Sequence, residues 1–92
     1  MYSEAKKPVA QKRKLVTAIP GPKSAELIKR RGEAVSASLG TAFPVFIDHS
    51  EGAIIVDVDG NSILDLGAGI AVLNVGHSAK EVRENVKRQI DA

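Results

Sequence analysis

The fold is decided by AIIVDVDGNSILDL, residues 53–66. Two runs rich in β-branched residues flank an Asp-Gly pair, which is the pattern of a β-hairpin. Gly60 can adopt the positive φ that a tight turn requires, and alternation places Ile54, Val56 and Val58 on one face. The sequence therefore predicts an antiparallel hairpin with its turn at this Asp-Gly pair.

The chain before this hairpin predicts one more strand and one helix. Residues 45–48, VFID, form a short strand candidate, and a turn is expected over residues 49–52. This strand and the hairpin together make a three-stranded antiparallel meander. A helix is expected from Pro22 to Ser36, with Pro22 in its first turn and Ser24 as an alternative N-cap. The helix has a narrow apolar stripe, which indicates a surface position: Leu27, Ile28, Ala34 and Val35.

The chain after the hairpin predicts a loop and a second helix. Residues 67–69, GAG, end the meander, and Val72 and Leu73 are expected to be packing residues in the apolar stretch that follows. Ser78 and Glu81 have the spacing of a capping box at the start of a helix.

This second helix is predicted to place Val82, Val86 and Ile90 on one face, with Glu84 and Arg88 paired on the other. Its apolar stripe is still in phase at residue 92, and no glycine cap follows. We therefore expect the chain to be truncated within this helix.

Charge is distributed unevenly along the chain. Residues 1–14 contain five basic side chains and one acidic side chain, whereas the remaining 78 residues contain eight basic and ten acidic ones. A short charged end buries little apolar surface, so residues 1–14 are predicted to form a disordered basic tail. A phosphate-binding arm is the alternative, but nucleic-acid binding is disfavoured because Tyr2 is the only aromatic residue before Phe43.

Composition narrows the class of protein further. The chain is 43% apolar and 26% charged, has three aromatic residues and lacks cysteine. The lack of cysteine excludes disulfides and thiolate metal sites, and no apolar run approaches the roughly 20 residues that span a bilayer. We therefore expect a cytoplasmic α+β segment with a thin core and no membrane partner.

Single motifs in the sequence provide no catalytic machinery. Residues 57–61, DVDGN, resemble a calcium loop, but the glycine and glutamate positions of an EF-hand are not met. Residues 67–72, GAGIAV, begin like a dinucleotide fingerprint but lack its third glycine. His49 and His77 are 28 residues apart, and His77 is expected to bond to the backbone near the helix start. None of the eight lysines lies in the apolar setting of a Schiff-base lysine. The residues alone thus predict no catalytic, cofactor-binding or metal-binding residue.

The order of several segments resembles the start of PLP-dependent class III aminotransferases. These segments are Ile19-Pro20-Gly21-Pro22-Lys23-Ser24, Asp57-Val58-Asp59-Gly60-Asn61, Leu64-Asp65 and Gly69-Ile70-Ala71-Val72-Leu73-Asn74-Val75-Gly76-His77. The Asp-Gly hairpin followed by Leu-Asp is shared by many members, whereas the last run favours the 4-aminobutyrate branch over the ornithine-type branch. The resemblance covers residues 15–92, which correspond to only the first fifth or so of such an enzyme. Lys80 is a departure, because the family usually has a proline there.

This resemblance implies a fold-type I α/β subunit. The first helix and the meander would join the small domain, and the following helix would lead toward the large, PLP-binding domain. The complete enzyme would be a homodimer or higher homo-oligomer that transfers the amino group of 4-aminobutyrate to 2-oxoglutarate through PLP, giving succinate semialdehyde and glutamate. The resemblance also implies that Ile70 lines the pocket for a small ω-amino acid or 2-oxo acid, and that the PLP lysine lies beyond residue 92.

Two hypotheses of different classes remain from the sequence. In the first, residues 15–92 are the N-terminal part of an aminotransferase subunit and are inactive alone. In the second, the chain is a free-standing, non-catalytic α+β interaction module derived from an aminotransferase. For Ile70 the alternatives are a pocket wall and a core residue under the following helix.

Overall fold

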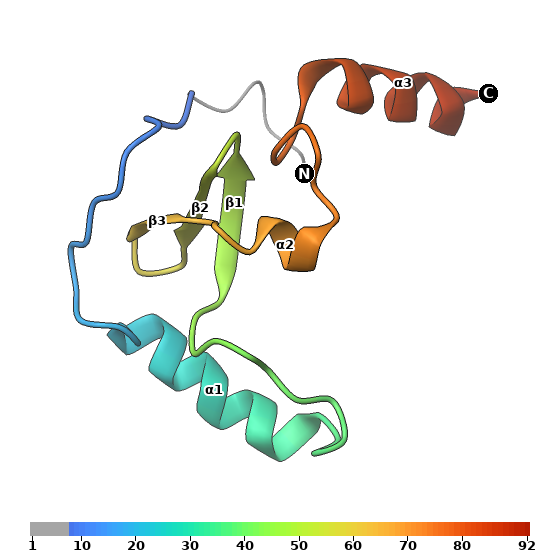
Figure 1. Cartoon of the computed structure of the whole chain (residues 1–92). Helices are drawn as coiled ribbons and strands as arrows, with labels where there is room; N and C mark the ends of the chain where they lie inside the picture. The colour runs from blue at the N-terminus through green and yellow to red at the C-terminus, as the bar shows by residue number, and fades with distance from the viewer. Residues whose placement is uncertain (1–7) are drawn as a thin grey trace.

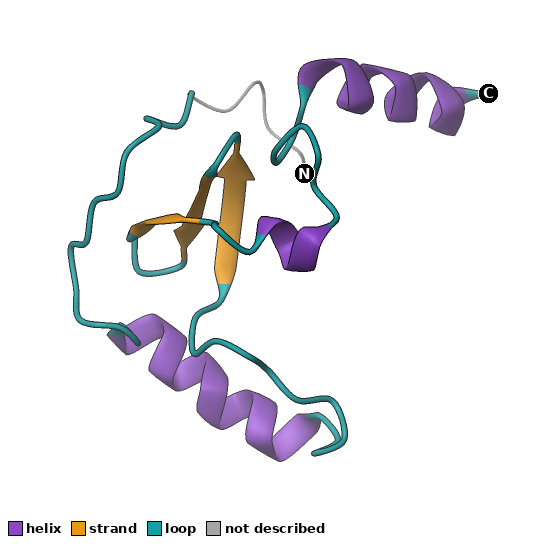
Figure 2. Ribbon diagram, viewed as in Figure 1, coloured by secondary structure: helices purple, strands orange, loops and turns teal. Residues whose placement is uncertain are grey.

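The computed structural model describes residues 8–92, which form one small sheet and three helical segments (Figure 1). The elements are α1 (Pro22–Ala34), β1 (Ile47–Glu51), β2 (Ile54–Asp57), β3 (Ser62–Leu64), α2 (Ala68–Ala71) and α3 (Lys80–Asp91). The sheet is antiparallel with strand order β1-β2-β3, which confirms the predicted α+β segment with a three-stranded meander. Figure 2 shows the sheet between α1 and α3.

The first strand of the meander lies later in the chain than predicted. Residues 49–51, assigned to a turn from the sequence, continue β1, and Glu51 pairs with Ile54. The chain reverses at Gly52, whose φ of 59° is one that glycine adopts without strain. The predicted turn over residues 49–52 was therefore wrong by position, because the chain reverses within Gly52 and Ala53, the two residues between Glu51 and Ile54.

The core consists of the central strand β2. Ile54 is fully buried and Ile55 is 8% exposed, although these neighbours point to opposite faces of the sheet. The predicted alternation is thus incomplete: Val56 and Val58 are half-buried, while Asp57 on the other face is buried. Both edges of β2 are paired because it is the middle strand, and Asn61 of the hairpin turn bonds to Asp57 at its end.

The segment before α1 is attached to the sheet. The backbone of Lys14 exchanges two hydrogen bonds with Ser62 on the free edge of β3, at 2.9 and 2.8 Å. The side chain of Gln11 donates to the carbonyl of Glu51 and accepts from the amide of Ala53. These contacts differ from the predicted tail over residues 1–14, because the edge strand supplies backbone partners that composition does not reveal. Residues 1–7 of that prediction lie outside the described chain.

Helix α1 is held by the hairpin turn. The Oδ1 atom of Asp59 accepts from the amide of Lys23 at 2.8 Å, and its Oδ2 atom accepts from the amide of Ser24 at 2.9 Å. The predicted N-cap role of Ser24 is therefore wrong, since its buried hydroxyl instead accepts from the amide of Phe46. A Cβ atom on Gly21 would lie 2.4 Å from the Asp59 carboxyl carbon, so a glycine allows this close approach.

Helix α3 lacks the predicted capping box. It begins at Lys80 after Ala79, no side chain caps it, and Ser78 has a φ of 55° that removes its hydroxyl from the N-cap position. The predicted pair of Glu84 and Arg88 is also not formed. The Glu84 carboxylate lies 3.9 Å from the ammonium of Lys87, and Arg88 bonds to Asn85.

The apolar stripe of α3 is uncovered in this chain. Val82, Val86 and Ile90 are all exposed, and the helix has no buried residue. Within residues 8–92, no helix has both the length and the apolar character needed to cross a membrane.

Candidate functional site

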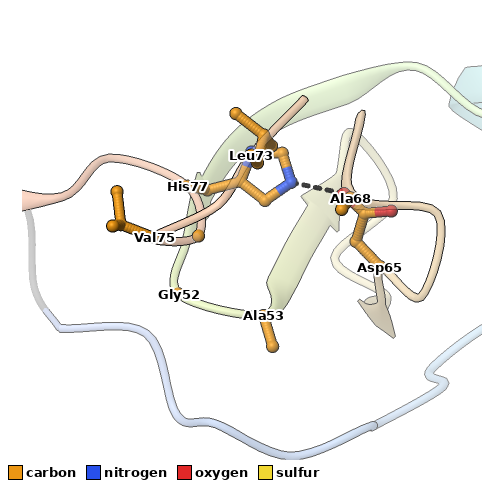
Figure 3. A pocket seen from close by; sticks show the side chains of 8 residues that line it. Gly52, Ala53, Asp65, Ala68, Leu73, Val75 and His77 are labelled. Atoms are coloured by element: carbon orange, nitrogen blue, oxygen red, sulfur yellow. Dashed lines mark hydrogen bonds and ion pairs between the residues drawn. The ribbon is translucent and has the colours of Figure 1, made fainter. Parts of the chain in front are cut away.

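A cavity of about 340 Å³ lies between the β1–β2 turn and the chain that follows β3 (Figure 3). Its eight lining residues are Gly52, Ala53, Asp65, Ala68, Leu73, Val75, Gly76 and His77. Most of these are small or apolar, and Asp65 and His77 supply the polar side chains. Residues 65–77 thus form most of a pocket that the sheet supports from one side.

Asp65 and His77 form a hydrogen-bonded pair in this cavity. The Oδ2 atom of Asp65 lies 2.6 Å from Nε2 of His77, and their side chains are only 16% and 17% exposed. The hydrogen bond from His77 is the main cause that holds the pKa of Asp65 below its usual value, although partial burial opposes it. Because the ionised carboxylate can only accept, Nε2 of His77 is the donor.

This pairing corrects the expectation for His77. Its side chain bonds to Asp65, and not to the backbone near the helix start. Its own backbone pairs with Gly52 through bonds of 2.9 and 2.8 Å. A Cβ atom on Gly76, whose φ is 80°, would lie 2.8 Å from the carbonyl oxygen of Gly52. Two glycines therefore allow the chain after α2 to pack directly on the β1–β2 turn.

The loop between Asp65 and His77 contains a left-handed run of backbone. Ala68, Gly69, Ile70 and Ala71 have φ values of 47°, 61°, 64° and 60°. A non-glycine residue in this region costs on the order of 1–2 kcal/mol, so surrounding contacts must hold the loop in place. One such contact is the amide of Gly69, which donates to Oδ2 of Asp65 at 3.1 Å.

Ile70 is 85% exposed on this loop. Within the described chain it is neither a core residue nor part of the cavity lining. Val72, which was expected to pack, is 72% exposed, whereas Leu73 lines the cavity. The left-handed turn changes the direction of the chain, so consecutive apolar residues in this stretch are not all buried.

The described residues do not form a PLP or metal centre. No lysine lines the cavity, and the described lysines are all exposed: Lys12, Lys14, Lys23, Lys29, Lys80 and Lys87. A cofactor that is held as a Schiff base needs an amine inside its pocket, so residues 8–92 do not fit PLP. Within the same residues, no group of three His, Cys, Asp or Glu side chains could hold a metal ion.

The residues that resemble a calcium loop have another role. Asp57 and Asn61 bond to each other, with the Asn61 side-chain amide 2.9 Å from Oδ2 of Asp57 and the Asn61 backbone amide 2.8 Å from Oδ1. The Asn61 oxygen accepts from the amides of Val16 and Thr17 at 2.7 and 2.9 Å. These side chains therefore organise the turn and the preceding segment.

Comparison with known proteins now identifies the family. The aminotransferase class-III family model matches residues 35–92. The chain belongs to the class III aminotransferases. It is 49% identical over 82 residues to the 4-aminobutyrate aminotransferase of Mycobacterium leprae, which covers 89% of this chain and 18% of the relative. It is 40% identical over 65 residues to that of Escherichia coli, covering 71% of the chain and 15% of the relative.

A solved transaminase structure has the same fold over most of the chain. An omega-transaminase from Sphaerobacter thermophilus superposes with a TM-score of 0.67 at 28% identity, covering 78% of this chain and 18% of that one. The chain thus spans less than a fifth of the length of these relatives. The likeness to this transaminase is consistent with a segment of a fold-type I enzyme, as the sequence resemblance implied.

Sequence reasoning missed the pairing of Asp65 with His77. Asp65 stood out only as part of a family pattern, and His77 as part of such a pattern and as an expected partner of the backbone near the helix start. A usable signal is that a carboxylate and an imidazole enclose a glycine-containing apolar loop. Polar residues at both ends of such a loop can meet and close it.

Proposed function

We propose that residues 15–92 are the N-terminal part of a PLP-dependent 4-aminobutyrate aminotransferase subunit. Such a subunit transfers the amino group of 4-aminobutyrate to 2-oxoglutarate and yields succinate semialdehyde and glutamate. The observation that carries this proposal is 49% identity over 82 residues to a relative of that name. A 5-aminovalerate aminotransferase of Pseudomonas putida is also similar, at 38% over 64 residues, so a homologous ω-amino acid is the second candidate substrate.

Ile70 is proposed as a wall of the substrate pocket. Its side chain is 85% exposed and projects from a backbone run that the core does not hold. An exposed apolar side chain on a constrained loop can contact the methylene chain of a short ω-amino acid and exclude water from it. This role discriminates by shape, and one methylene of mismatch is worth about 1–3 kcal/mol.

PLP is proposed to bind outside residues 8–92. When bound, the cofactor would supply the electron sink that amino transfer requires. The cavity without a lysine and the exposed lysines support this assignment. We expect the 92-residue chain alone to form no stoichiometric, borohydride-trapped PLP adduct and to catalyse no amino transfer; a site-specific adduct on one lysine would contradict this.

The complete enzyme is proposed to be a cytoplasmic homodimer or higher homo-oligomer. Support for additional protein contacts comes from large apolar side chains that the described chain leaves exposed: Leu66, Ile70, Val72, Val75 and Ile90, at 92%, 85%, 72%, 69% and 76%. Four of these five side chains lie close together in the sequence, between Leu66 and Val75, and exposed apolar surface is often covered by other parts of a protein.

A chimaeric enzyme tests the proposed function. Residues 8–92 would replace the corresponding segment of the M. leprae relative, and amino transfer from 4-aminobutyrate to 2-oxoglutarate would be measured as succinate semialdehyde formed. We expect kcat/KM for 4-aminobutyrate within about tenfold of the parent enzyme, because pocket-wall differences cost little for the correct substrate.

The parent enzyme and 5-aminovalerate provide the controls. A chimaera that contains PLP at full stoichiometry but prefers 5-aminovalerate would favour the second substrate. A PLP-loaded chimaera that transfers neither amino group would overturn the proposal.

A further inference from the structure

We infer that Asp65 and His77 are positioning residues that jointly fix the loop carrying Ile70, and thereby set which length of ω-amino acid the complete enzyme accepts. This inference rests on the proposed function. The pair touches no reacting atom in this role. It acts by determining where the side chain of Ile70 lies relative to the sheet.

The loop needs such a restraint because it has little packing of its own. Ile70 and Val72 are 85% and 72% exposed, and Ala68 and Leu73 face a cavity of about 340 Å³. Four consecutive residues hold positive φ values, three of them other than glycine. A loop with a strained backbone and open space beneath it can relax toward that space unless polar contacts prevent it.

Asp65 supplies these polar contacts through one atom. Its Oδ2 accepts from the amide of Gly69 at 3.1 Å and from Nε2 of His77 at 2.6 Å. Gly69 precedes Ile70 directly, so the carboxylate is one residue from the side chain that it positions. The second bond holds the carboxylate itself, because a short charge-assisted hydrogen bond restricts its rotation.

His77 connects this carboxylate to the β1–β2 turn of the sheet. Its backbone makes two hydrogen bonds to Gly52 in the β1–β2 turn. The side chain of Gln11 bonds to both neighbours of that glycine, to the carbonyl of Glu51 and the amide of Ala53. A continuous series of hydrogen bonds therefore runs from the sheet through His77 and Asp65 to the loop, as Figure 3 shows for its central pair.

The experiment uses the chimaeric holoenzyme and two substrates that differ by one methylene. Asp65→Ala and His77→Ala are each expected to change the ratio of kcat/KM for 4-aminobutyrate to that for 5-aminovalerate by about fivefold or more. The ratio is the informative readout, since a loss of folded or PLP-loaded enzyme lowers both values equally. The double variant should change the ratio no more than the larger single change, because one unit is disrupted once.

Asp59→Ala is the matched control. Asp59, like Asp65, accepts two hydrogen bonds, but its donors are the backbone amides at the start of α1, and no bond joins it to the loop. Its ratio should stay within about twofold of the unmutated chimaera, since the site is remote. Asp65→Asn and His77→Gln keep polar atoms in place and should restore part of the ratio, which also covers the case in which an alanine variant does not fold.

A second measurement separates this inference from the proposed function. Amide hydrogen exchange in the 92-residue chain should accelerate at Gly69 by about tenfold or more in Asp65→Ala, as expected when an amide loses its acceptor, while α1 is unaffected. An active chimaera whose ratio is unchanged in both alanine variants would overturn the positioning role. An unmutated chimaera without ω-amino acid transfer would instead overturn the proposed function.

Discussion

The chain segments before and after β3 are held in place by different kinds of contact. At the hairpin turn before it, Asp57, Asp59 and Asn61 bond to one another or to backbone amides, and Asp57 and Asn61 are almost fully buried. In the loop after it, Asp65 alone reaches the backbone, and the surrounding apolar side chains are exposed. The turn is complete within this chain, whereas the loop presents its side chains outward.

This difference shows that the structural role of a short polar side chain depends on its surroundings. In the turn, the side chain of Asn61 makes four hydrogen bonds, and three of them join residues that are more than 40 positions apart, so the polar network takes the place of a larger core. In the loop, a single carboxylate restrains a backbone that the core does not support. Stability resides in the first region, and we assign recognition to the second.

The largest expected effect is the loss of the turn network in Asn61→Ala. The substitution removes the partner of Oδ2 of the buried Asp57 and of the part-buried amides of Val16 and Thr17. The free energy of unfolding should fall by about 3 kcal/mol or more, measured by urea unfolding of the 92-residue chain. Asn74→Ala at an exposed position is the control, and equal urea midpoints for the two variants would show that the network does not stabilise the fold.

Two glycine-to-alanine substitutions test whether the close packing of the chain on the β1–β2 turn requires a glycine. Gly76→Ala places a Cβ atom 2.8 Å from a backbone oxygen at a φ of 80°, and should destabilise the chain by about 2 kcal/mol. Gly32→Ala in α1 meets nothing within 4 Å and should stabilise it by about 0.5–1 kcal/mol. Melting temperatures that shift in the same direction for both variants would contradict the assigned geometry.

Ile70 separates recognition from stability. In the chimaera, Ile70→Gln or Ile70→Tyr should lower kcat/KM for 4-aminobutyrate by roughly tenfold or more and change the preference among ω-amino acids of different length. The melting temperature should hardly move, because the side chain is 85% exposed. Ile70→Ala with a large loss of stability and an unchanged substrate preference would make Ile70 a core residue of the complete enzyme instead.

The smallest expected effect is the response of both regions to acid. Backbone amides of Ser24 and Lys23 outweigh desolvation and hold the pKa of Asp59 below its usual value, and His77 does the same for Asp65. A lowered pKa in the folded state stabilises the chain above the unfolded value, and this contribution is lost as the pH falls through the folded value.

The urea midpoint should therefore be level from pH 7 to about 5 and fall below about pH 4. Asp59→Asn and Asp65→Asn should each flatten this dependence and lower the midpoint at pH 7. Glu26→Gln, at an exposed position of α1, serves as the control. Equal acid dependence in all three variants would contradict the roles given to these aspartates.

The sequence predicted the elements whose signals are local. The hairpin, the meander and both long helices follow from β-branched runs, an Asp-Gly turn and helical spacing. The errors concern interactions between distant residues. Asp59 replaces Ser24 at the start of α1, and Ser78 adopts a positive φ instead of capping α3.

The candidate site was predictable only in part for the same reason. The glycines near residues 67–69 indicated a sharp change of direction, but not that the run of positive φ would continue through Ile70 and Ala71. That conformation is unfavourable for each non-glycine residue taken alone, and it is held by the bonds around Asp65 together with backbone bonds inside the loop. A short-range propensity cannot reveal a restraint that arises across twelve residues.

The bonds from Asn61 to Val16 and Thr17 also have a consequence for synthesis on the ribosome. These partners are 45 and 44 positions apart, so the first is made long before the residue that holds it. At about 5–20 residues per second, the interval is roughly 2–9 s. Throughout it, the nascent segment around Val16 lacks the side chain that will hold it, and pauses in translation between these positions would lengthen the time before it can dock.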